Sequence, residues 1–374
     1  MLNYKVRLYW IKLARIRKKY FIKGVFFFAL LLLCVVFCDY FHYKTGVSLP
    51  GFIRCFLFRS RDSQQIVKAQ HPAAIVYLTS LSRLFQLTKS LQHLFENFND
   101  QFHYPVAIFH YGAMNERFTF CICEAALNRE RASVIHMVAA ENIREFPPSF
   151  RGEDYSGGRE IVFRNYFPDY QFMCAFFFLG IYRQSWIIEN NISYYMRLDS
   201  DSYILSKINY DIFEYMRKHN LAYAYRVRSG ESSCCSRYLT KLIRMYIRDE
   251  GMQITSKDVE WIGKYNWEEL EMLDTTKESA APMEQYYANL EVVNVQSFRD
   301  DPEVFKWEMA VWNDTRYHVN GIFTQRWGDS LLRFYTVHLF PQLWKRIHYL
   351  CDIEYYHQFD FPRTCNFTDK IITV

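Results

Sequence analysis

Residues 194–216, "YYMRLDSDSYILSKINYDIFEYM", join a strand-like apolar run to a helical one through two carboxylates. The first run is rich in aromatic and other strand-forming residues and stops abruptly at Asp199-Ser200-Asp201. Beyond the acidic triplet, apolar residues recur at helical spacing over 210–219. The triplet is therefore predicted at the carboxyl end of a strand, which is the edge of an open α/β sheet where ligands bind.

Two chemical interpretations of this triplet are open. Carboxylates are hard oxygen ligands suited to Mg²⁺ or Mn²⁺, and such ions bridge the oxygens of phosphate groups. An enzyme that transfers a sugar from a nucleotide needs this chemistry, because negative charge gathers on the departing diphosphate in the transition state. The alternative is a solvated turn that binds nothing.

The chain upstream of the triplet has the pattern of an α/β sheet. Strand-like runs cover 73–79, 104–112 and 132–139, and residues 80–99 between the first two carry leucines at helical spacing. A strand, a helix and a second strand in this order predict a right-handed βαβ unit with parallel strands. We therefore expect one Rossmann-type α/β domain over 71–374.

Charge is distributed unevenly along the 374 residues, of which half are hydrophobic and 19% aromatic. Residues 1–38 hold eight of the 45 basic residues and no acidic one, which leaves 37 basic against 40 acidic residues in the rest. A body so close to neutral excludes the basic footprint of a nucleic-acid-binding protein. The apolar content excludes a disordered chain.

The basic segment leads into an uncharged run over 24–38, and adding the apolar residues just before it gives a near-adequate membrane span. No small-residue cleavage site follows, and the positive flank should stay cytoplasmic. We predict a cytoplasmic tail (1–19), a signal-anchor helix (20–38), a stem (39–70) and a lumenal catalytic domain, in the Golgi or an early secretory membrane. A cleaved signal peptide is the alternative.

Two further features fit a lumenal domain. The triplets at Asn191, Asn313 and Asn366 are acceptors for N-glycosylation. Ten cysteines are present, and setting aside Cys34 and Cys38 in the predicted span leaves an even eight. Some of these eight are expected to pair in an oxidising compartment, although their connectivity does not follow from the sequence, and buried free thiols are the alternative.

The chain resembles the fungal Golgi α-1,2-mannosyltransferases of glycosyltransferase family 15. The resemblance lies in "YQFMC" (170–174), in residues 194–216, in "NLEVVNVQSFR" (289–299), and in "GIFTQRWGDSLLRFYTVHLF" (321–340) followed by "IHYLCDIEYYHQFDFPRTC" (347–365). It implies a GT-A-like fold and a retaining, Mn²⁺-dependent transfer of mannose from GDP-mannose. The acceptor would be a hydroxyl of a glycan or glycoprotein, and the new linkage α-1,2.

The resemblance also implies roles for individual side chains. Asp199 is expected to bind Mn²⁺ directly with support from Asp201, and His357 matches a second metal ligand, for which imidazole is suitable. Arg197 is expected near the diphosphate, where a guanidinium neutralises charge, and Tyr170 at the donor site. The alternatives are a solvated turn, a structural histidine and a surface arginine.

Two more acids are candidate catalytic residues. Glu291 is surrounded by apolar residues, which should raise its pKa, and it could act as a nucleophile or as an ion-pair stabiliser beneath the sugar. The alternative is a structural glutamate at a helix start. Asp329 could accept the proton of the acceptor hydroxyl or position the acceptor, or it could cap the helix that follows.

The chain departs from the family at the acidic triplet, where the family has Glu-Pro-Asp, and at Ala175, where an arginine is common. Two other functions are therefore kept open. The first is a transferase of the same fold that uses another nucleotide sugar, and the second is a non-catalytic lumenal protein that binds glycans or serves as a scaffold. The sequence does not distinguish an N-glycan, O-glycan or lipid-linked acceptor.

Overall fold

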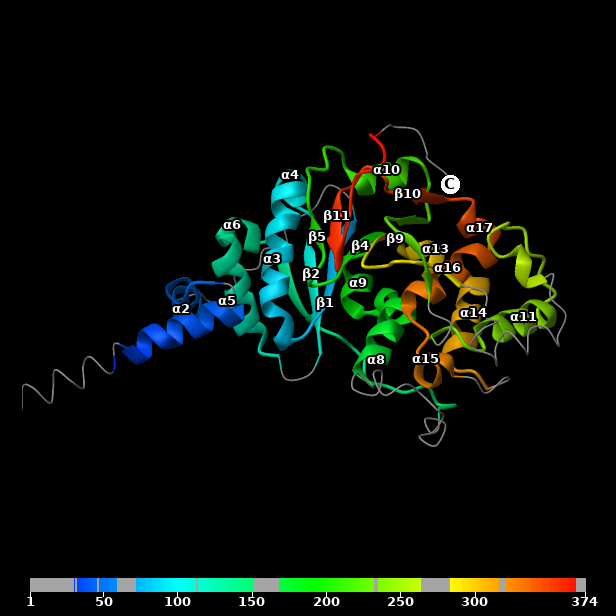
Figure 1. Cartoon of the computed structure of the whole chain (residues 1–374), viewed down its shortest axis with the longest axis horizontal. Coiled ribbons are helices and arrows are strands. Elements are labelled where there is room, and N and C mark those ends of the chain that lie inside the picture. Colours follow the sequence, from blue (N-terminus) through cyan, green and yellow to red (C-terminus); the bar gives the residue numbers. More distant parts are fainter. Residues whose placement is uncertain are drawn as a thin grey trace, which may run out of the picture.

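The protein is described by a computed structural model, shown in Figure 1. The described residues are 30, 32–45, 47–58, 72–111, 114–150, 168–231, 235–263, 283–315 and 320–367. The predicted cytoplasmic tail (1–19) and most of the predicted span (20–38) lie outside them. Within the described residues, no helix has the length and apolar character needed to cross a membrane.

A seven-stranded sheet organises the domain, in the order β10-β6-β9-β4-β1-β2-β3. Its strands are parallel except β9, which runs antiparallel to both neighbours, β4 and β6. The bounds are β1 Ala73–Thr79, β2 Val106–His110, β3 Ile135–Ala139, β4 Tyr194–Leu198, β6 Tyr223–Tyr225, β9 Leu290–Asn294 and β10 Ile347–Tyr349. The predicted α/β sheet and the parallel βαβ unit are confirmed.

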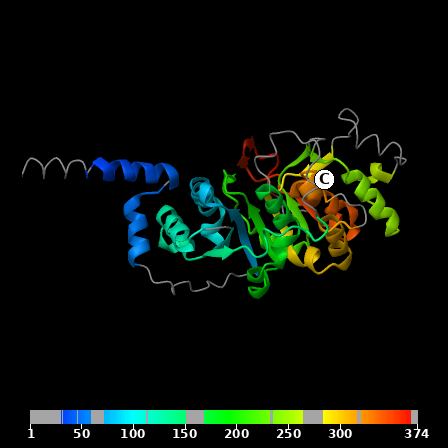
Figure 2. The same ribbon diagram turned by 90° about the horizontal axis from the view of Figure 1, so that it is seen from below.

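The sheet separates two apolar cores, because successive side chains of a strand point to opposite faces. Along β1, Ala74 and Val76 belong to one core, while Ala73, Ile75 and Tyr77 belong to the other. A sheet that is covered on both sides produces strands that are apolar throughout, which is the pattern of these runs in the sequence. Figures 1 and 2 show helices on both sides of the sheet.

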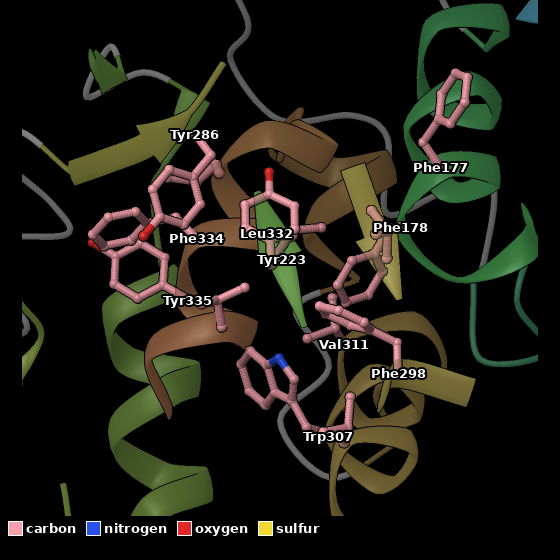
Figure 3. Close-up of a cluster of buried hydrophobic side chains, with 14 of the residues drawn as sticks. Phe177, Phe178, Tyr223, Tyr286, Phe298, Trp307, Val311, Leu332, Phe334 and Tyr335 are labelled. Carbon is pink, nitrogen blue, oxygen red and sulfur yellow. The ribbon is translucent and has the colours of Figure 1, made fainter. Parts of the chain in front are cut away.

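Different helices cover the two faces. One core includes residues of α3 (Leu84–Leu94), α5 (Glu116–Leu127) and α10 (Ile212–Lys218). The other includes residues of α8 (Asp169–Ala175), α11 (Leu239–Asp249), α14 (Pro302–Trp312) and α16 (Asp329–Leu339), and Figure 3 shows part of it. The shorter helices are α4 Asp100–Phe102, α6 Arg129–Ala132, α9 Ser185–Glu189, α13 Val295–Arg299, α15 Gly321–Thr324 and α17 Pro341–Trp344.

Two small sheets complete the domain. A two-stranded sheet pairs β7 (Arg228–Glu231) with β8 (Met283–Tyr286). A three-stranded sheet has the order β12-β11-β5, with bounds Phe359–Phe361, Tyr355–His357 and Tyr203–Ile204. The second of these sheets matters for the site, because it joins the segment after the acidic triplet to the last part of the chain.

Part of the predicted stem (39–70) is packed on the domain. Its residues 49–58 form helix α2 (Leu49–Phe58), in which Cys55 is buried and bonded to Cys121 of α5. Figure 2 shows α2 beside the domain, at an angle to the preceding helix, residues 32–45. The apolar spacing of this short helix is weak in the sequence, and its packing depends on a partner 66 residues away.

The structure pairs some of the eight cysteines that lie beyond the predicted span. Besides the bond from α2 to α5, a second disulfide joins Cys351 and Cys365. Among the described residues of the domain, Cys123 and Cys174 are buried thiols that form no disulfide. Of the predicted glycosylation acceptors, Asn191 and Asn366 are exposed, whereas the amide oxygen of Asn313 accepts a hydrogen bond from the Ser149 backbone at 2.9 Å.

Candidate active site

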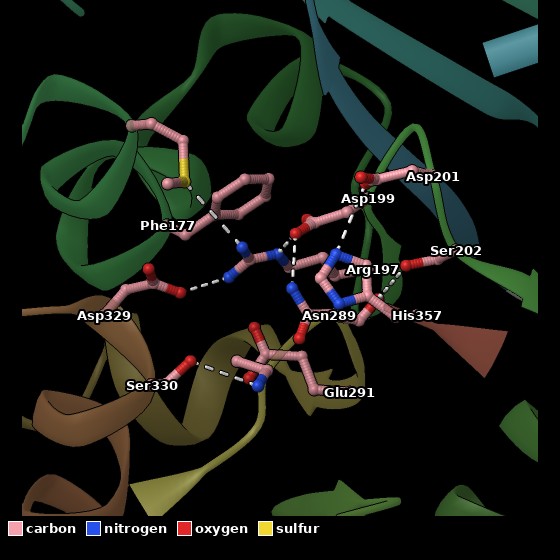
Figure 4. A network of polar contacts seen from close by, with 12 residues as sticks. Phe177, Arg197, Asp199, Asp201, Ser202, Asn289, Glu291, Asp329, Ser330 and His357 are labelled. Atoms are coloured by element: carbon pink, nitrogen blue, oxygen red, sulfur yellow. Dashed lines mark hydrogen bonds and ion pairs between the residues drawn. The ribbon is translucent and has the colours of Figure 1, made fainter. Parts of the chain in front are cut away.

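The acidic triplet lies at the carboxyl end of β4, as the sequence predicts (Figure 4). Asp199 accepts a hydrogen bond from Arg197 Nε at 3.0 Å on one oxygen, and from Asn289 Nδ2 at 2.6 Å on the other. Asn289 comes from the turn just before β9, so the antiparallel strand delivers it to this edge. Asn289 was not predicted as a site residue, because its only local signal is its position two residues before Glu291.

Arg197 is the centre of the polar edge. Its side chain is only 2% exposed, its Nη1 pairs with Asp329 of α16, and its guanidinium lies 3.6 Å from the ring centroid of Phe177. Burial disfavours the charged form, but Asp199 and Asp329 outweigh this effect and raise the pKa of Arg197 above its ordinary value. The alternative interpretation of a surface arginine is therefore wrong.

Asp329 is the first residue of α16 and is buried. The N-cap of this helix is Gly328, whose extended backbone precedes the first turn, so the capping position predicted as an alternative for Asp329 is occupied by its neighbour. A carboxylate in the first turn also interacts favourably with the helix dipole. The side chain points to the sheet, where it meets Arg197.

Glu291 is the second residue of β9 and has no solvent exposure. It is the register partner of Arg197, and its Oε2 lies 3.4 Å from Nε of Arg333 on α16. Burial raises the pKa of Glu291, as its apolar neighbours in the sequence predict, while Arg333 and Arg197 oppose the rise. A glutamate at a helix start, the alternative interpretation, is wrong. Arg333 was missed, although it stands four residues after Asp329 and thus on the same helix face.

The small sheet brings His357 to Asp201. Because β11 pairs antiparallel with β5, the imidazole Nε2 of His357 lies 3.3 Å from Asp201 Oδ1. The other ring nitrogen, Nδ1, is hydrogen-bonded to the hydroxyl of Tyr287 at 2.8 Å. The hydrogen bond from His357 holds the pKa of Asp201 below its usual value, with a smaller contribution from Arg83 at 3.5 Å.

These contacts test the predicted Mn²⁺ ligands. Asp201 and His357 converge, and a second hydrogen bond fixes the ring orientation of His357, as is usual for a metal-ligating histidine. Asp199 instead directs both oxygens at Arg197 and Asn289. Among the described residues, no group of three or more histidine, cysteine or acidic side chains is arranged around a common metal position. A carboxylate and an imidazole are donors that suit Mn²⁺, so the chemistry of Asp201 and His357 fits such an ion.

Tyr170 lies next to this edge but not in the Arg197 cluster. It belongs to α8, its ring lies 4.4 Å from the guanidinium of Arg326, and a Cβ at Gly328 would lie 3.3 Å from its hydroxyl. Tyr170 therefore packs on the turn that leads into α16. On the other side of this helix start, Ser330 Oγ accepts a hydrogen bond from the Ala288 backbone at 3.2 Å, which ties α16 to the turn before β9.

The arrangement is the fold of a glycosyltransferase. The chain superposes on the mannosyltransferase Ktr4p of Saccharomyces cerevisiae with a TM-score of 0.64 at 20% identity, covering 84% of this chain and 80% of that one. A second Ktr4p structure is a complex with GDP. Core-mannan synthase A of Aspergillus fumigatus, in its Mn/GDP form, also has a TM-score of 0.64, at 18% identity over 84% and 83% of the two chains.

A sequence model of the glycolipid 2-alpha-mannosyltransferase family matches residues 56–373, and the chain belongs to this family. It is 23% identical over 299 residues to glycolipid 2-alpha-mannosyltransferase 1 of Candida albicans, and 24% identical over 300 residues to glycolipid 2-alpha-mannosyltransferase of S. cerevisiae. The matches cover 76% and 78% of this chain, and 62% of the length of each relative. The resemblance to the fungal α-1,2-mannosyltransferases is confirmed.

Proposed function

We propose that this protein is a retaining, metal-dependent mannosyltransferase that moves mannose from GDP-mannose to a hydroxyl of a glycan, forming an α-1,2 linkage. The observation that carries the proposal is the polar edge of the sheet: Arg197 held between two carboxylates, beside the Asp201–His357 pair. The names of the relatives and the GDP and Mn/GDP forms of the similar structures support the donor and the metal.

In this proposal, Asp201 and His357 would hold Mn²⁺, with Asp199 adjacent. The ion would neutralise charge on the diphosphate as the sugar departs. Tyr287 keeps Nε2 of His357 directed at the ligand position by bonding the other ring nitrogen. Arg197 contributes a fixed positive charge at the end of β4, and its stacking on Phe177 with two carboxylate partners prevents it from reorienting.

Glu291 is proposed to stabilise the positive charge that develops on the sugar. Neither of its oxygens is exposed, so its burial favours the electrostatic role over direct attack on the anomeric carbon. A charge in a site of low dielectric acts more strongly than one in water. Asp329 is proposed to position the acceptor or to take its proton, and Tyr170, at the neighbouring turn, to contact the donor.

The proposed location is the lumenal side of a Golgi or early secretory membrane, with residues 20–38 as a signal anchor. The basic residues before this run and its lack of charge after Lys23 support the orientation. Two disulfides in the domain are typical of an oxidising compartment.

A donor assay tests the proposal. Purified protein should hydrolyse or transfer from GDP-mannose in preference to other nucleotide sugars, and a chelator should abolish the activity until Mn²⁺ is added back. Preference for another nucleotide sugar would indicate a transferase with a different donor. Binding of glycans without turnover of any donor would indicate a lectin-like or scaffold protein and would overturn the proposal.

A further inference from the structure

A chain of polar side chains runs behind the candidate site into the interior of the domain. It consists of Glu291, Arg333, Tyr182 and Glu308, each no more than 1% exposed. They come from β9, α16, the short 3-10 helix Ile181–Arg183 and α14, respectively. Burying ionisable groups this deeply destabilises the fold unless they are paired, so the contacts between these four side chains are what permit their burial.

Each of the three guanidinium nitrogens of Arg333 has a partner in the interior of the domain. Its Nε faces Glu291 at 3.4 Å, Nη1 donates to the hydroxyl of Tyr182 at 3.2 Å, and Nη2 donates to the Phe177 carbonyl at 2.7 Å. Nη2 also lies 3.4 Å from the hydroxyl of Tyr195 on β4. The guanidinium is thus fixed from three directions and cannot turn away from the carboxylate.

Glu308 supports the other end of the chain. Its Oε1 accepts a hydrogen bond from the Tyr182 hydroxyl at 2.5 Å, and its Oε2 lies 3.5 Å from Nη2 of Arg183. The same hydroxyl also contacts the Phe178 carbonyl, and its oxygen accepts a hydrogen bond from Arg333, so Tyr182 touches both Glu308 and Arg333. The aromatic rings around this point, including that of Phe298 at 4.8 Å from the Arg333 guanidinium, exclude water.

The charges around Glu291 show why Arg333 matters. Arg197 is its register partner, but that guanidinium already pairs with Asp199 and Asp329. The hydroxyl of Tyr223 lies close to the Glu291 carboxylate without meeting hydrogen-bond geometry, and among the described residues neither carboxylate oxygen accepts a hydrogen bond. Arg333 is therefore the cation most directly available to this carboxylate.

We propose that Arg333 is a positioning residue that keeps Glu291 ionised and in a single orientation, and that Tyr182 and Glu308 hold Arg333 in place for this task. The inference rests on the role proposed above for Glu291. Without a neighbouring positive charge, a fully buried carboxylate takes up a proton, and a neutral Glu291 cannot stabilise positive charge on a sugar. The negative charge of Asp329 opposes Arg333, because it raises the pKa of Glu291 and so favours the protonated form.

The first test measures the pH dependence of turnover. In Arg333→Met, kcat at pH 7 should fall at least about tenfold while KM for GDP-mannose changes little. The reason is that each unit by which the pKa of Glu291 rises above the pH lowers its ionised fraction about tenfold. The acidic limb of the profile should move to higher pH, so activity should partly recover on alkalinisation. Arg333→Lys, which keeps the charge, should lose less activity than Arg333→Met. Tyr182→Phe should also move the acidic limb to higher pH.

Arg346→Met is the matched control, because Arg346 bonds Gln342 and Ser297 away from this interior chain. Its profile should keep the wild-type shape. A folded Arg333→Met protein with the wild-type profile would overturn the proposal, and so would an equal loss of turnover at every pH, since a purely structural arginine would produce that result. If Arg333→Met does not fold, the pH profiles of Arg333→Lys and Tyr182→Phe are compared with that of the wild type instead.

A second measurement does not depend on activity. The infrared spectrum of the wild type minus that of Glu291→Gln isolates the bands of this one carboxyl group. At pH 7 the wild type should show a carboxylate, and the same difference in an Arg333→Met background should show the C=O stretch of a protonated acid. If the wild type transfers no sugar but these spectra differ, the proposed function fails and the positioning role stands. A carboxylate in both backgrounds refutes that role.

Discussion

Arg197 and Glu291 face each other as register partners across β4 and β9, and both side chains are buried on the same face of the sheet. Helix α16 covers them with Asp329 and Arg333, one helical turn apart, so each sheet residue meets an opposite charge from the helix. The candidate site is thus continuous with the core of the domain. Substitutions in it should be assessed for stability and for turnover together.

Glu291→Gln should lower turnover by at least about 10²-fold, roughly 2.7 kcal/mol of barrier, with GDP-mannose binding near that of the wild type. The substitution keeps the shape of the side chain but removes a charge that acts only in the transition state. Because Arg333 loses its partner, the melting temperature should also fall. Turnover per folded molecule and thermal unfolding are to be measured on one preparation.

The control for this experiment is Asp211→Ala. Asp211 caps α10 by accepting from the Phe213 and Glu214 backbones, and it accepts a hydrogen bond from Tyr104 at 2.7 Å. Its loss should cost about 1–2 kcal/mol of stability and leave the turnover of the folded fraction unchanged. If Glu291→Gln behaves like this control, Glu291 has no part in the chemistry.

Removal of either proposed metal ligand should weaken Mn²⁺-dependent GDP binding. Asp201→Asn and His357→Ala should each reduce affinity by at least about tenfold, and Tyr287→Phe should have a smaller effect in the same direction. Asp360→Asn, an exposed acid on β12, is the control and should bind as the wild type does. Calorimetric titration with GDP, with and without a chelator, measures the effect. Wild-type GDP binding that is indifferent to the chelator contradicts the metal assignment.

Asp199→Asn should differ from these variants. Asp199 holds Arg197 and Asn289, so its loss should lower the melting temperature even in the presence of a chelator. Asp201→Asn and His357→Ala should lower it mainly by removing the stabilisation that bound metal provides. Thermal unfolding with and without Mn²⁺ separates the two effects, and equal behaviour of all three variants would show that Asp199 is simply a third ligand.

Stability should depend on the protonation of Glu308. Burial raises the pKa of Glu308 to about 7, whereas hydrogen bonding by Tyr182 and the charges of Arg183 and Arg333 oppose the rise. The folded state then binds this proton more tightly than the unfolded state, so the contribution is fully present at low pH and is lost as pH rises from about 4.5 to 7. The loss is about 3 kcal/mol for such a pKa difference.

Glu308→Gln keeps the acceptor for Tyr182 and removes the titration. The difference in unfolding free energy between this variant and the wild type, measured with denaturant from pH 4.5 to 7.5, should therefore grow in favour of the variant as pH rises. A difference that does not change with pH would show that Glu308 titrates at the same pH in the folded and unfolded states.

The disulfide between α2 and α5 should stabilise the domain. It closes a loop of 66 residues, for which the chain-entropy account gives roughly 4 kcal/mol, whereas the Cys351–Cys365 bond closes only 14 residues and gives roughly 3 kcal/mol. The double substitution Cys55→Ser with Cys121→Ser should lower the unfolding free energy. Reductant should then destabilise the variant less than it destabilises the wild type. An unchanged unfolding free energy would show that the disulfide between α2 and α5 does not stabilise the domain.

The membrane orientation is testable in sealed vesicles. Protease added outside should spare the chain from residue 40 onward, because the basic tail stays on the cytoplasmic side and the domain lies within. Detergent should make the domain accessible. Digestion of the domain in intact vesicles would reverse the predicted topology.

Local patterns in the sequence determined the sheet and the location of the acids. The apolar run 73–79 became β1 with those bounds, and the triplet at Asp199 falls at the end of β4 as predicted. The isolation of Glu291 among apolar residues indicated its burial and its raised pKa. These features depend on the period of side chains along one strand and on nearest neighbours, both of which the sequence displays directly.

Only the tertiary structure decided which groups meet. His357 reaches Asp201 because β11 pairs with β5, and Arg333 reaches Glu291 because α16 packs on the face of the sheet that β4 and β9 share. The hydrogen bond from Asn289 to Asp199 likewise follows from the antiparallel placement of β9 beside β4. Pairings across 42 to 156 residues depend on how buried surfaces and charges from distant segments fit together, and no local pattern encodes that fit.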